Sequence, residues 1–535
     1  MKTALPKVTR RPQVYTFSVR DLLHEIRGGR VRVPEFQRPQ RWRSTHVIDL
    51  FDSMWRGFPI GSLLFSKGPA PAGTIHFGPS QVVAPALQDA LFVVDGQQRV
   101  TALAGALLHP DKRPRGDIHA LWFDLEEECF VRLTRAEAPL HWIPLNVLDG
   151  SVEQLRWLNE WALRTDRPDL VQRSLAVGQT IREYTIPAYI VDGASESALR
   201  VIFKRVNTAG VAMKEEEVFE ALHGSGDRSL GAASARLCET GFGEIKRQDL
   251  LDALKAVEGI DPRERFRDAE GDIDVSPEAL ERTEVAVRRV ITFLVSIAGI
   301  PHVKLLPYKL PLRLLSRFFD LHPAPEARTL ELLKRWVWRG ALTKHHRDTS
   351  DATVSRLQAC VGDDPVAATQ ALLAALPDDV AGFPTSVDRW NGREAVTRLF
   401  ALAIFGAEPR DPTSGEVLDT EAIQGLLAEH DLGDIYFRVD DAESIAARFL
   451  VRSRDDMGLI LSPSTLLQLP DLWRSHLLEG SIVDAFASGD LERGVALRGE
   501  ILDRWSRTFF RERSGAGESD RPSIASILAR VKATG

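Results

Sequence analysis

Residues 91–107 read LFVVDGQQRVTALAGAL, and this stretch decides how the N-terminal part of the chain folds. The apolar run at 91–94 has the length and composition of a buried strand. Gly96 permits a tight turn, and the residues from 97 to 108 favour a helix. Because the first turn of a helix exposes unpaired backbone N–H groups at the positive end of its dipole, this strand–turn–helix predicts an anion site.

The turn Asp95-Gly96-Gln97-Gln98-Arg99 carries side chains whose chemistry suits a phosphate ligand. Arg99 offers a planar fork for phosphate oxygens. Gln97 and Gln98 can orient a water molecule or a base edge, and Asp95 can accept a proton or hold a metal ion. A structural alternative stays open from the residues alone, in which Asp95 caps the helix and Arg99 forms a structural ion pair.

A second candidate segment is 34–42, PEFQRPQRW, whose two prolines exclude a regular helix. Arg38, Arg41 and Trp42 combine cations with a stacking surface, which suits a base together with its phosphates. Taken alone, the segment is better explained as a proline-ordered basic loop that Trp42 anchors in the core.

A third candidate segment is 202–210, IFKRVNTAG, where a predicted helix ends at a polar turn. Asn207 tolerates a left-handed backbone conformation there, and Gly210 releases the chain from the helix. On its own this pattern predicts a helix C-cap and no chemistry.

The rest of the chain predicts an α+β protein. Short strands recur between residues 117 and 195, whereas beyond residue 225 the apolar residues return with the 3.6-residue period of helices. A chain of 535 residues is too long for one hydrophobic core. We therefore expect an α+β domain over residues 1–225, a helical middle domain over 226–387 and a helical C-terminal domain over 388–535. Residues 514–523, SGAGESDRPS, are expected to form a flexible linker.

Composition limits the class of protein. Hydrophobic residues make up 44% and charged residues 27%, as in an ordinary globular protein. The most apolar window, 290–303, is too short to cross a bilayer, and the N-terminus lacks the apolar core of a signal peptide. Cys129, Cys238 and Cys360 lie far apart, which supports neither a disulfide framework nor a zinc site. We therefore expect a cytoplasmic protein with no membrane partner.

The charge is unevenly distributed along the chain. The net charge is −7, but residues 1–60 contain twelve Lys or Arg and five Asp or Glu, a local charge of +7 that leaves −14 for the rest. A basic N-terminal face on an acidic body suits the binding of one polyanion in one place. A solvated basic surface without a ligand explains the same charge pattern.

The order of these segments, PEFQRPQRW, FPIGSLL, VVDGQQR and FKRVNTAG over residues 14–225, resembles a known domain. It is the ParB/sulfiredoxin-like domain at the N-terminus of GmrSD-type (Type IV) restriction proteins, which also occurs in phosphorothioate-sensing SspE defence proteins. The resemblance implies that the DGQQR turn binds and hydrolyses a nucleoside triphosphate in defence against foreign DNA. It marks Asp95, Gln97, Gln98 and Arg99 as catalytic residues, and Gln37, Arg38, Trp42, Gly96, Arg205 and Asn207 as nucleotide-binding residues.

The same resemblance implies further sites and partners. The first predicted helix is 18–28, which Ser18 can cap. Tyr15 and Phe17 precede it, near where such sensors have aromatic side chains that probe a DNA modification, and Arg41 joins them as a DNA-sensing residue. Mg²⁺ is the implied cofactor, while ATP, GTP and CTP all remain open as the nucleotide. DNA is the implied macromolecular partner, and both a partner defence subunit and a homo-oligomer are compatible with the resemblance.

In this family the C-terminal section usually carries an HNH-type nuclease, which needs a histidine to activate water and further ligands around one metal ion. Here the corresponding stretch is 433–441, GDIYFRVDD, and His430 is the nearest histidine that could compensate. We expect a degenerate nuclease fold whose remaining role is DNA binding or partner docking. The family's catalytic positions are occupied by Asp434, Arg438, Ala447 or Arg448, and Asp456.

No metal site is predicted elsewhere in the chain. His345 and His346 are adjacent, and neighbours on a helix point about 100° apart, so the pair predicts a polar helix end rather than a chelate.

Three functional hypotheses follow from the sequence. The leading one is an NTPase that interacts with DNA in restriction-type defence. The second is a metal-dependent nuclease that uses the N-terminal site itself. The third is a non-catalytic module in which nucleotide binding switches the affinity for DNA or a partner. The absence of a Walker A sequence excludes only the P-loop route to nucleotide binding.

Overall fold

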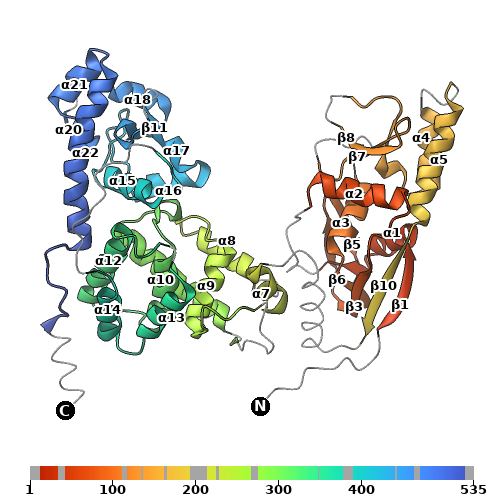
Figure 1. The fold of residues 1–535 in the computed structure, drawn as a ribbon, viewed down its shortest axis with the longest axis horizontal. Coiled ribbons are helices and arrows are strands. Elements are labelled where there is room, and N and C mark those ends of the chain that lie inside the picture. Colours follow the sequence, from red (N-terminus) through yellow and green to blue (C-terminus); the bar gives the residue numbers. More distant parts are fainter. Residues whose placement is uncertain are drawn as a thin grey trace. The chain divides into compact units, whose positions relative to one another are not determined.

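A computed structural model divides the chain into two compact units, residues 1–225 and 226–535 (Figure 1). A β-sheet with covering helices forms the first unit, and the second is mainly helical, so the expected α+β fold class is confirmed. The further division of the second unit at residue 387 stays a prediction. The structure describes residues 12–33, 42–110, 117–133, 137–161, 166–192, 214–223, 228–266, 275–276, 278–347, 349–377, 390–439, 443–462 and 470–524.

The first unit is built on a five-stranded mixed sheet. The pairs β1/β10 and β3/β6 are antiparallel, whereas β10/β3 and β2/β6 are parallel. These directions bring the C-terminal ends of β2 and β6 and the N-terminal end of β3 to one edge of the sheet. In spatial order the strands are β1 (Gln13–Ser18), β10 (Thr185–Asp192), β3 (Leu63–Ala70), β6 (Leu87–Asp95) and β2 (Val31–Arg32).

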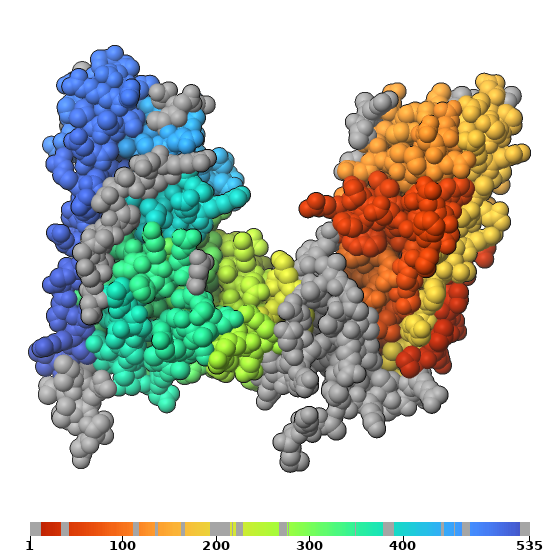
Figure 2. Space-filling model, viewed as in Figure 1, coloured from red at the N-terminus to blue at the C-terminus, as the bar shows by residue number. Residues whose placement is uncertain are grey.

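Helices bury one face of this sheet in a single core. The first helix begins where the sequence predicts it, because the Ser18 hydroxyl accepts a hydrogen bond from the Asp21 backbone N–H at 3.1 Å. In the space-filling view the side chains of the two yellow helices α4 and α5 form one flank of this unit (Figure 2). The described helices of the unit are α1 (Val19–Arg27), α2 (Ser44–Trp55), α3 (Gln97–Leu107), α4 (Ser151–Glu160), α5 (Pro168–Glu183) and α7 (Glu215–His223).

Two smaller sheets complete the first unit. The hairpin of β4 (Gly73–Phe77) and β5 (Ser80–Ala84) lies between β3 and β6 in the chain, where the sequence analysis expected no strand. Its alternating side chains Ile75, Phe77 and Val82 are buried in the common core, so contacts from distant elements stabilise this hairpin. The other sheet has the order β8 (Cys129–Arg132), β7 (Leu121–Asp124) and β9 (Trp142–Pro144), followed by the 3-10 turn η1 (Leu145–Val147).

The second unit packs its helices around buried aromatic side chains. Trp338 is 1% exposed, its indole N–H donates to the Ala298 carbonyl at 2.9 Å, and its ring contacts Phe509 at 5.5 Å between centroids. No helix in the described part of the chain is long and apolar enough to span a bilayer. The elements are α8 (Leu230–Cys238), α9 (Arg247–Glu258), α10 (Ala279–Phe293), η2 (Leu294–Ala298), η3 (Val303–Leu305), α11 (Leu310–Leu321), α12 (Ala327–Leu342), α13 (Asp351–Cys360), α14 (Pro365–Ala374), α15 (Ala395–Phe405), α16 (Thr420–Glu429), α17 (Leu432–Ile435), β11 (Tyr436–Arg438), η4 (Ile445–Ala447), β12 (Arg448–Leu450), α18 (Arg454–Ile460), α20 (Pro470–Ser475), α21 (Gly480–Ala487) and α22 (Leu491–Ser514).

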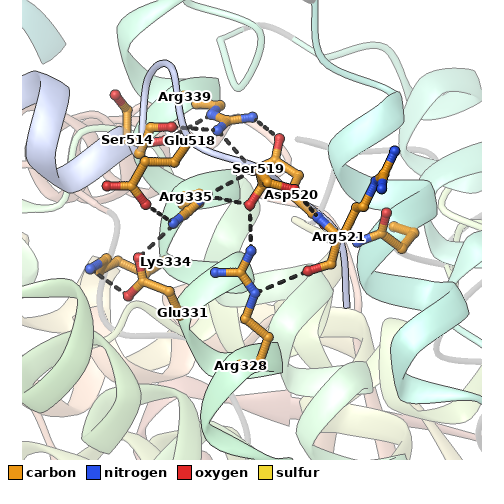
Figure 3. Close-up of polar contacts among 12 residues, drawn as sticks. Arg328, Glu331, Lys334, Arg335, Arg339, Ser514, Glu518, Ser519, Asp520 and Arg521 are labelled. Carbon is orange, nitrogen blue, oxygen red and sulfur yellow. Dashed lines mark hydrogen bonds and ion pairs between the residues drawn. The ribbon is translucent and has the colours of Figure 1, made fainter. Parts of the chain in front are cut away.

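The segment 514–523 is not the flexible linker that its composition predicts. Arg335 of α12 is 2% exposed and donates to the Ser519 carbonyl at 3.0 Å and to Asp520 Oδ1 at 3.1 Å (Figure 3). Arg339, one turn further along α12, donates to the Ser514 carbonyl at 2.8 Å and also pairs with Asp520. The expectation is wrong because the acceptors of this segment meet arginines about 180 residues earlier in the chain, which local composition cannot reveal.

Candidate functional site

The turn after β6 has the predicted strand–turn–helix geometry. Gly96 is the N-cap of α3 with φ at +91°, a left-handed conformation that glycine adopts without steric cost. A Cβ at Gly96 would lie 2.3 Å from Leu63 Cδ2, so packing also requires glycine here. The first intrahelical bond joins the Val100 N–H to the Gly96 carbonyl at 2.9 Å, and no described side chain caps the amides that precede it. The start of α3 is therefore a candidate anion site.

A β-bulge beside the turn decides the direction of Asp95. Leu91 and Val93 point into the core, so regular alternation would also point Asp95 inward. The register between β3 and β6 shifts, however, so that Phe65 faces Val93 while Leu64 faces Asp95. The extra residue turns Asp95 to the opposite face of the sheet, and its side chain is 31% exposed.

Arg99 joins the turn to the start of β3. Its Nη1 donates to the Ile60 carbonyl at 2.9 Å, and its Nη2 pairs with Asp95 Oδ2 at 3.2 Å. A Cβ at Gly61, where φ is +84°, would lie 2.6 Å from Arg99 Nη1, so glycine admits the guanidinium. The structural ion pair that the sequence left open is thus present, but Gly96 and not Asp95 is the N-cap.

Gln97 and Gln98 lie half-buried in the first turn of α3. The Oε1 atom of Gln98 is buried and has no hydrogen-bond partner among the described residues. A buried acceptor without a donor costs about 1–3 kcal/mol, so such an atom calls for an explanation. A water molecule or a ligand N–H or O–H that donates to Gln98 would remove this cost.

β2 precedes the candidate segment 34–42 in the chain. Because β2 and β6 are parallel, the C-terminal end of β2 lies at the same edge of the sheet as the turn 95–99. Trp42, at the end of that segment, is half-buried against the core and stacks on His46 at 6.2 Å between ring centroids. Outside the described residues lie the predicted nucleotide-binding residues Gln37, Arg38, Arg205 and Asn207 and the predicted DNA-sensing residue Arg41.

The two aromatic residues predicted to sense DNA have different surroundings. Phe17 is 8% exposed and packs edge-on against Phe65, with ring centroids 6.1 Å apart, so it is a core residue. Tyr15 is 52% exposed and stacks on Phe17. Of this pair, only Tyr15 offers surface to a ligand.

Part of the basic excess near the N-terminus is neutralised within the fold. Arg30 pairs with Asp89 at 2.8 Å, and Asp89 lies outside residues 1–60. Arg27 forms an ion pair with Asp149. Local ion pairing therefore accounts for part of the charge pattern that the sequence analysis associated with a polyanion.

In the C-terminal region, the residues at the predicted nuclease positions have structural partners. Asp434 Oδ2 accepts the Asp431 N–H at 3.1 Å and caps α17. The Arg448 guanidinium lies 5.0 Å from the centre of the Trp390 ring, and Asp456 Oδ2 accepts a hydrogen bond from the Ser453 hydroxyl at 2.8 Å. Within the described ranges, no group of three His, Cys, Asp or Glu side chains is placed to hold a metal ion. Loss of the nuclease centre stays a prediction.

His430 is one of the residues that line a pocket of about 500 Å³ beside α16. Three carboxylates and one arginine line this pocket, so its charge does not suit a phosphate ligand. The lining residues are Asp419, Glu421, Ala422, Gly425, Leu426, Glu429, His430 and Arg452.

Two comparisons with known proteins give matches, and the family match lies in the first unit. Residues 19–224 match the family model described as GmrSD restriction endonuclease, N-terminal domain. A stretch of 102 residues is 30% identical to an uncharacterized protein of Methanocaldococcus jannaschii, and it covers 18% of each chain. This chain thus matches less than a fifth of the length of that curated relative. The segment 19–224 is similar to the N-terminal domain of GmrSD-type restriction endonucleases.

Proposed function

From the similarity of residues 19–224 to the GmrSD N-terminal domain, we propose that this segment binds and hydrolyses a nucleoside triphosphate at the turn 95–99. The observation that carries the proposal is a glycine-capped helix start beside the buried Oε1 of Gln98, which has no hydrogen-bond partner among the described residues. The amides of α3 accommodate phosphate oxygens, and Gln98 accepts a hydrogen bond from the attacking water.

Arg99 has a positioning role in this proposal. Two of the five guanidinium N–H groups already serve Ile60 and Asp95, so the side chain holds the turn against the start of β3. This leaves the helix amides as the main phosphate contact, with Arg99 adding positive potential at close range. The sequence suggested that the Arg99 guanidinium serves phosphate alone; in this proposal it shares that role with its contacts to Ile60 and Asp95.

Mg²⁺ fits the turn only together with its substrate. Asp95 is the carboxylate of the motif, and it is 31% exposed and able to hold one coordination position. Mg²⁺ sites in phosphate-handling proteins use one or two carboxylates and complete the shell with phosphate oxygens and water. When bound, Mg²⁺ would neutralise charge on the triphosphate, while Asp95 fixes its place.

The proposal is tested by phosphate release from ATP, GTP and CTP with Mg²⁺, with and without DNA. Gln98→Met removes the buried acceptor at similar volume, and we expect turnover to fall at least tenfold. Gln179→Met on α5, where the amide contacts Glu183 one turn away, is the matched control and should retain full activity. Absence of turnover with all three nucleotides, or full turnover in Gln98→Met, would refute the assignment.

The wider role that we propose is restriction-type defence acting on DNA, within the ParB/sulfiredoxin-like superfamily. The supporting observation is the family match over residues 19–224. A partner subunit and homo-oligomer formation belong to the same proposal, and size-exclusion chromatography with light scattering, with and without nucleotide and DNA, measures both.

A nucleotide-controlled switch without turnover is the second candidate. The ion pair and hydrogen bond of Arg99 couple the turn to Ile60, so a ligand that attracts Asp95 or Arg99 also shifts the start of β3. Tight nucleotide binding without phosphate release favours this candidate. Metal-dependent nicking of plasmid DNA that Asp95→Asn abolishes would instead favour a nuclease at the same turn.

A further inference from the structure

Four residues on four adjacent strands form a row that ends at the candidate site. Val14 faces Tyr189, Tyr189 faces Leu64, and Leu64 faces Asp95 in the registers of β1, β10, β3 and β6. Residues paired in this way project from the same face of a sheet. We call these four residues the outer strip.

The outer strip points away from the helix-covered core. The residues that alternate with it along β3 and β10, namely Leu63, Phe65, Ala188 and Ile190, are at most 8% exposed. Val14 is 68% exposed and Tyr189 is 43% exposed. The strip therefore presents an apolar and an aromatic side chain to solvent, in a row that ends at Asp95 of the turn.

The charge and length of the strip suit a neutral planar group that is joined to a phosphate chain through a ribose. The strip has one ionised residue, Asp95, and Arg99 already forms an ion pair with it. A neutral planar group that stacks on Tyr189 therefore meets no unpaired charge within the strip. Adjacent strands lie 4.7–4.9 Å apart, which places Tyr189 about 10 Å from Asp95 across β3. A ribose and a phosphate chain span such a distance.

We infer that Tyr189 is the base-stacking residue for a nucleotide whose phosphates bind at the start of α3. The inference rests on the proposed function and adds the position of the base to it. Leu64, half-exposed between Tyr189 and Asp95, packs under the ribose. Because stacking uses the face of a base and not its edge, this arrangement accepts several bases and favours purines through their larger surface.

The inference is tested by measuring the affinity of the full chain for ATP and for inorganic tripolyphosphate. Loss of a stacked base costs a factor of about ten or more in affinity. Tyr189→Ala should therefore weaken ATP binding about tenfold and leave tripolyphosphate binding unchanged, whereas Tyr189→Phe should keep both. Leu155→Ala on α4, an apolar side chain of 51% exposure away from the strip, is the matched control.

The outcomes separate this inference from the proposed function. If Gln98→Met weakens ATP binding and Tyr189→Ala does not, the base lies elsewhere and only the inference fails. Equal losses for ATP and tripolyphosphate in Tyr189→Ala also overturn it, because stacking cannot affect a ligand without a base. Failure of the wild-type chain to bind either ligand overturns the proposed function together with the inference. Photocrosslinking of 8-azido-ATP to the wild-type protein locates the base independently. A crosslink outside β10 contradicts the placement of the base on Tyr189.

Discussion

Replacing Arg99 by methionine should destabilise the first unit as well as any nucleotide complex. The guanidinium is 18% exposed and makes one bond to the Ile60 carbonyl and one ion pair with Asp95. A hydrogen bond from a charged group contributes about 1.5–3 kcal/mol, and a partly exposed ion pair up to about 1 kcal/mol. We therefore expect Arg99→Met to lower the free energy of unfolding by about 3 kcal/mol.

Urea unfolding of the full chain measures this loss, and hydrogen exchange locates it. The backbone of segment 58–66 should exchange faster in Arg99→Met, because Arg99 holds the start of β3 through Ile60. Arg56→Met is the matched control, since Arg56 is 53% exposed and pairs with Asp52 one turn away, so its loss should leave the free energy of unfolding nearly unchanged. A loss below about 1 kcal/mol with unchanged exchange at 58–66 would refute the role assigned to Arg99.

This prediction determines how nucleotide-binding variants are interpreted. A weaker affinity in an Arg99 variant does not by itself identify a phosphate contact, because the turn is disturbed at the same time. Gln98→Met should leave stability unchanged or raise it by about 1 kcal/mol, since it removes a buried acceptor without a described partner. Binding loss in Gln98→Met therefore reports on the ligand and not on the fold.

Three further perturbations are expected to act on stability. Gly96→Ala combines a φ of +91° with a contact to β3 and should cost about 3 kcal/mol in urea unfolding. Asp520→Ala removes the carboxylate shared by Arg335 and Arg339; we expect proteolysis within 515–524 to accelerate, and an unchanged rate contradicts the anchoring role. Burial lowers the pKa of His346 to about 3, so the unfolded chain binds a proton below pH 6.5 that the folded chain excludes. The contribution of His346 to the free energy of unfolding is therefore full above pH 6.5 and falls towards pH 3, by about 2 kcal/mol between pH 7 and pH 5. In His346→Leu this pH dependence should be smaller.

Local physical chemistry was sufficient to predict the centre of the candidate site from the sequence. The apolar run at 91–94, the glycine at 96 and the helix that follows form a strand–turn–helix because each preference involves only neighbouring residues. The Ser18 cap of α1 and the α+β class were predictable for the same reason. The chemical role of the turn, in contrast, stays a proposal.

Only the tertiary structure decided how the side chains of the site are directed. The partner of Arg99 is a carbonyl 39 residues away, and the bulge that turns Asp95 outward depends on the register between two strands. The nearness of Tyr189 to the turn depends on β10 pairing with β3 across more than a hundred residues of sequence. Periodicity in the sequence specifies which residues can form a strand, but strand order and register depend on packing between distant elements, because that packing determines which faces are buried.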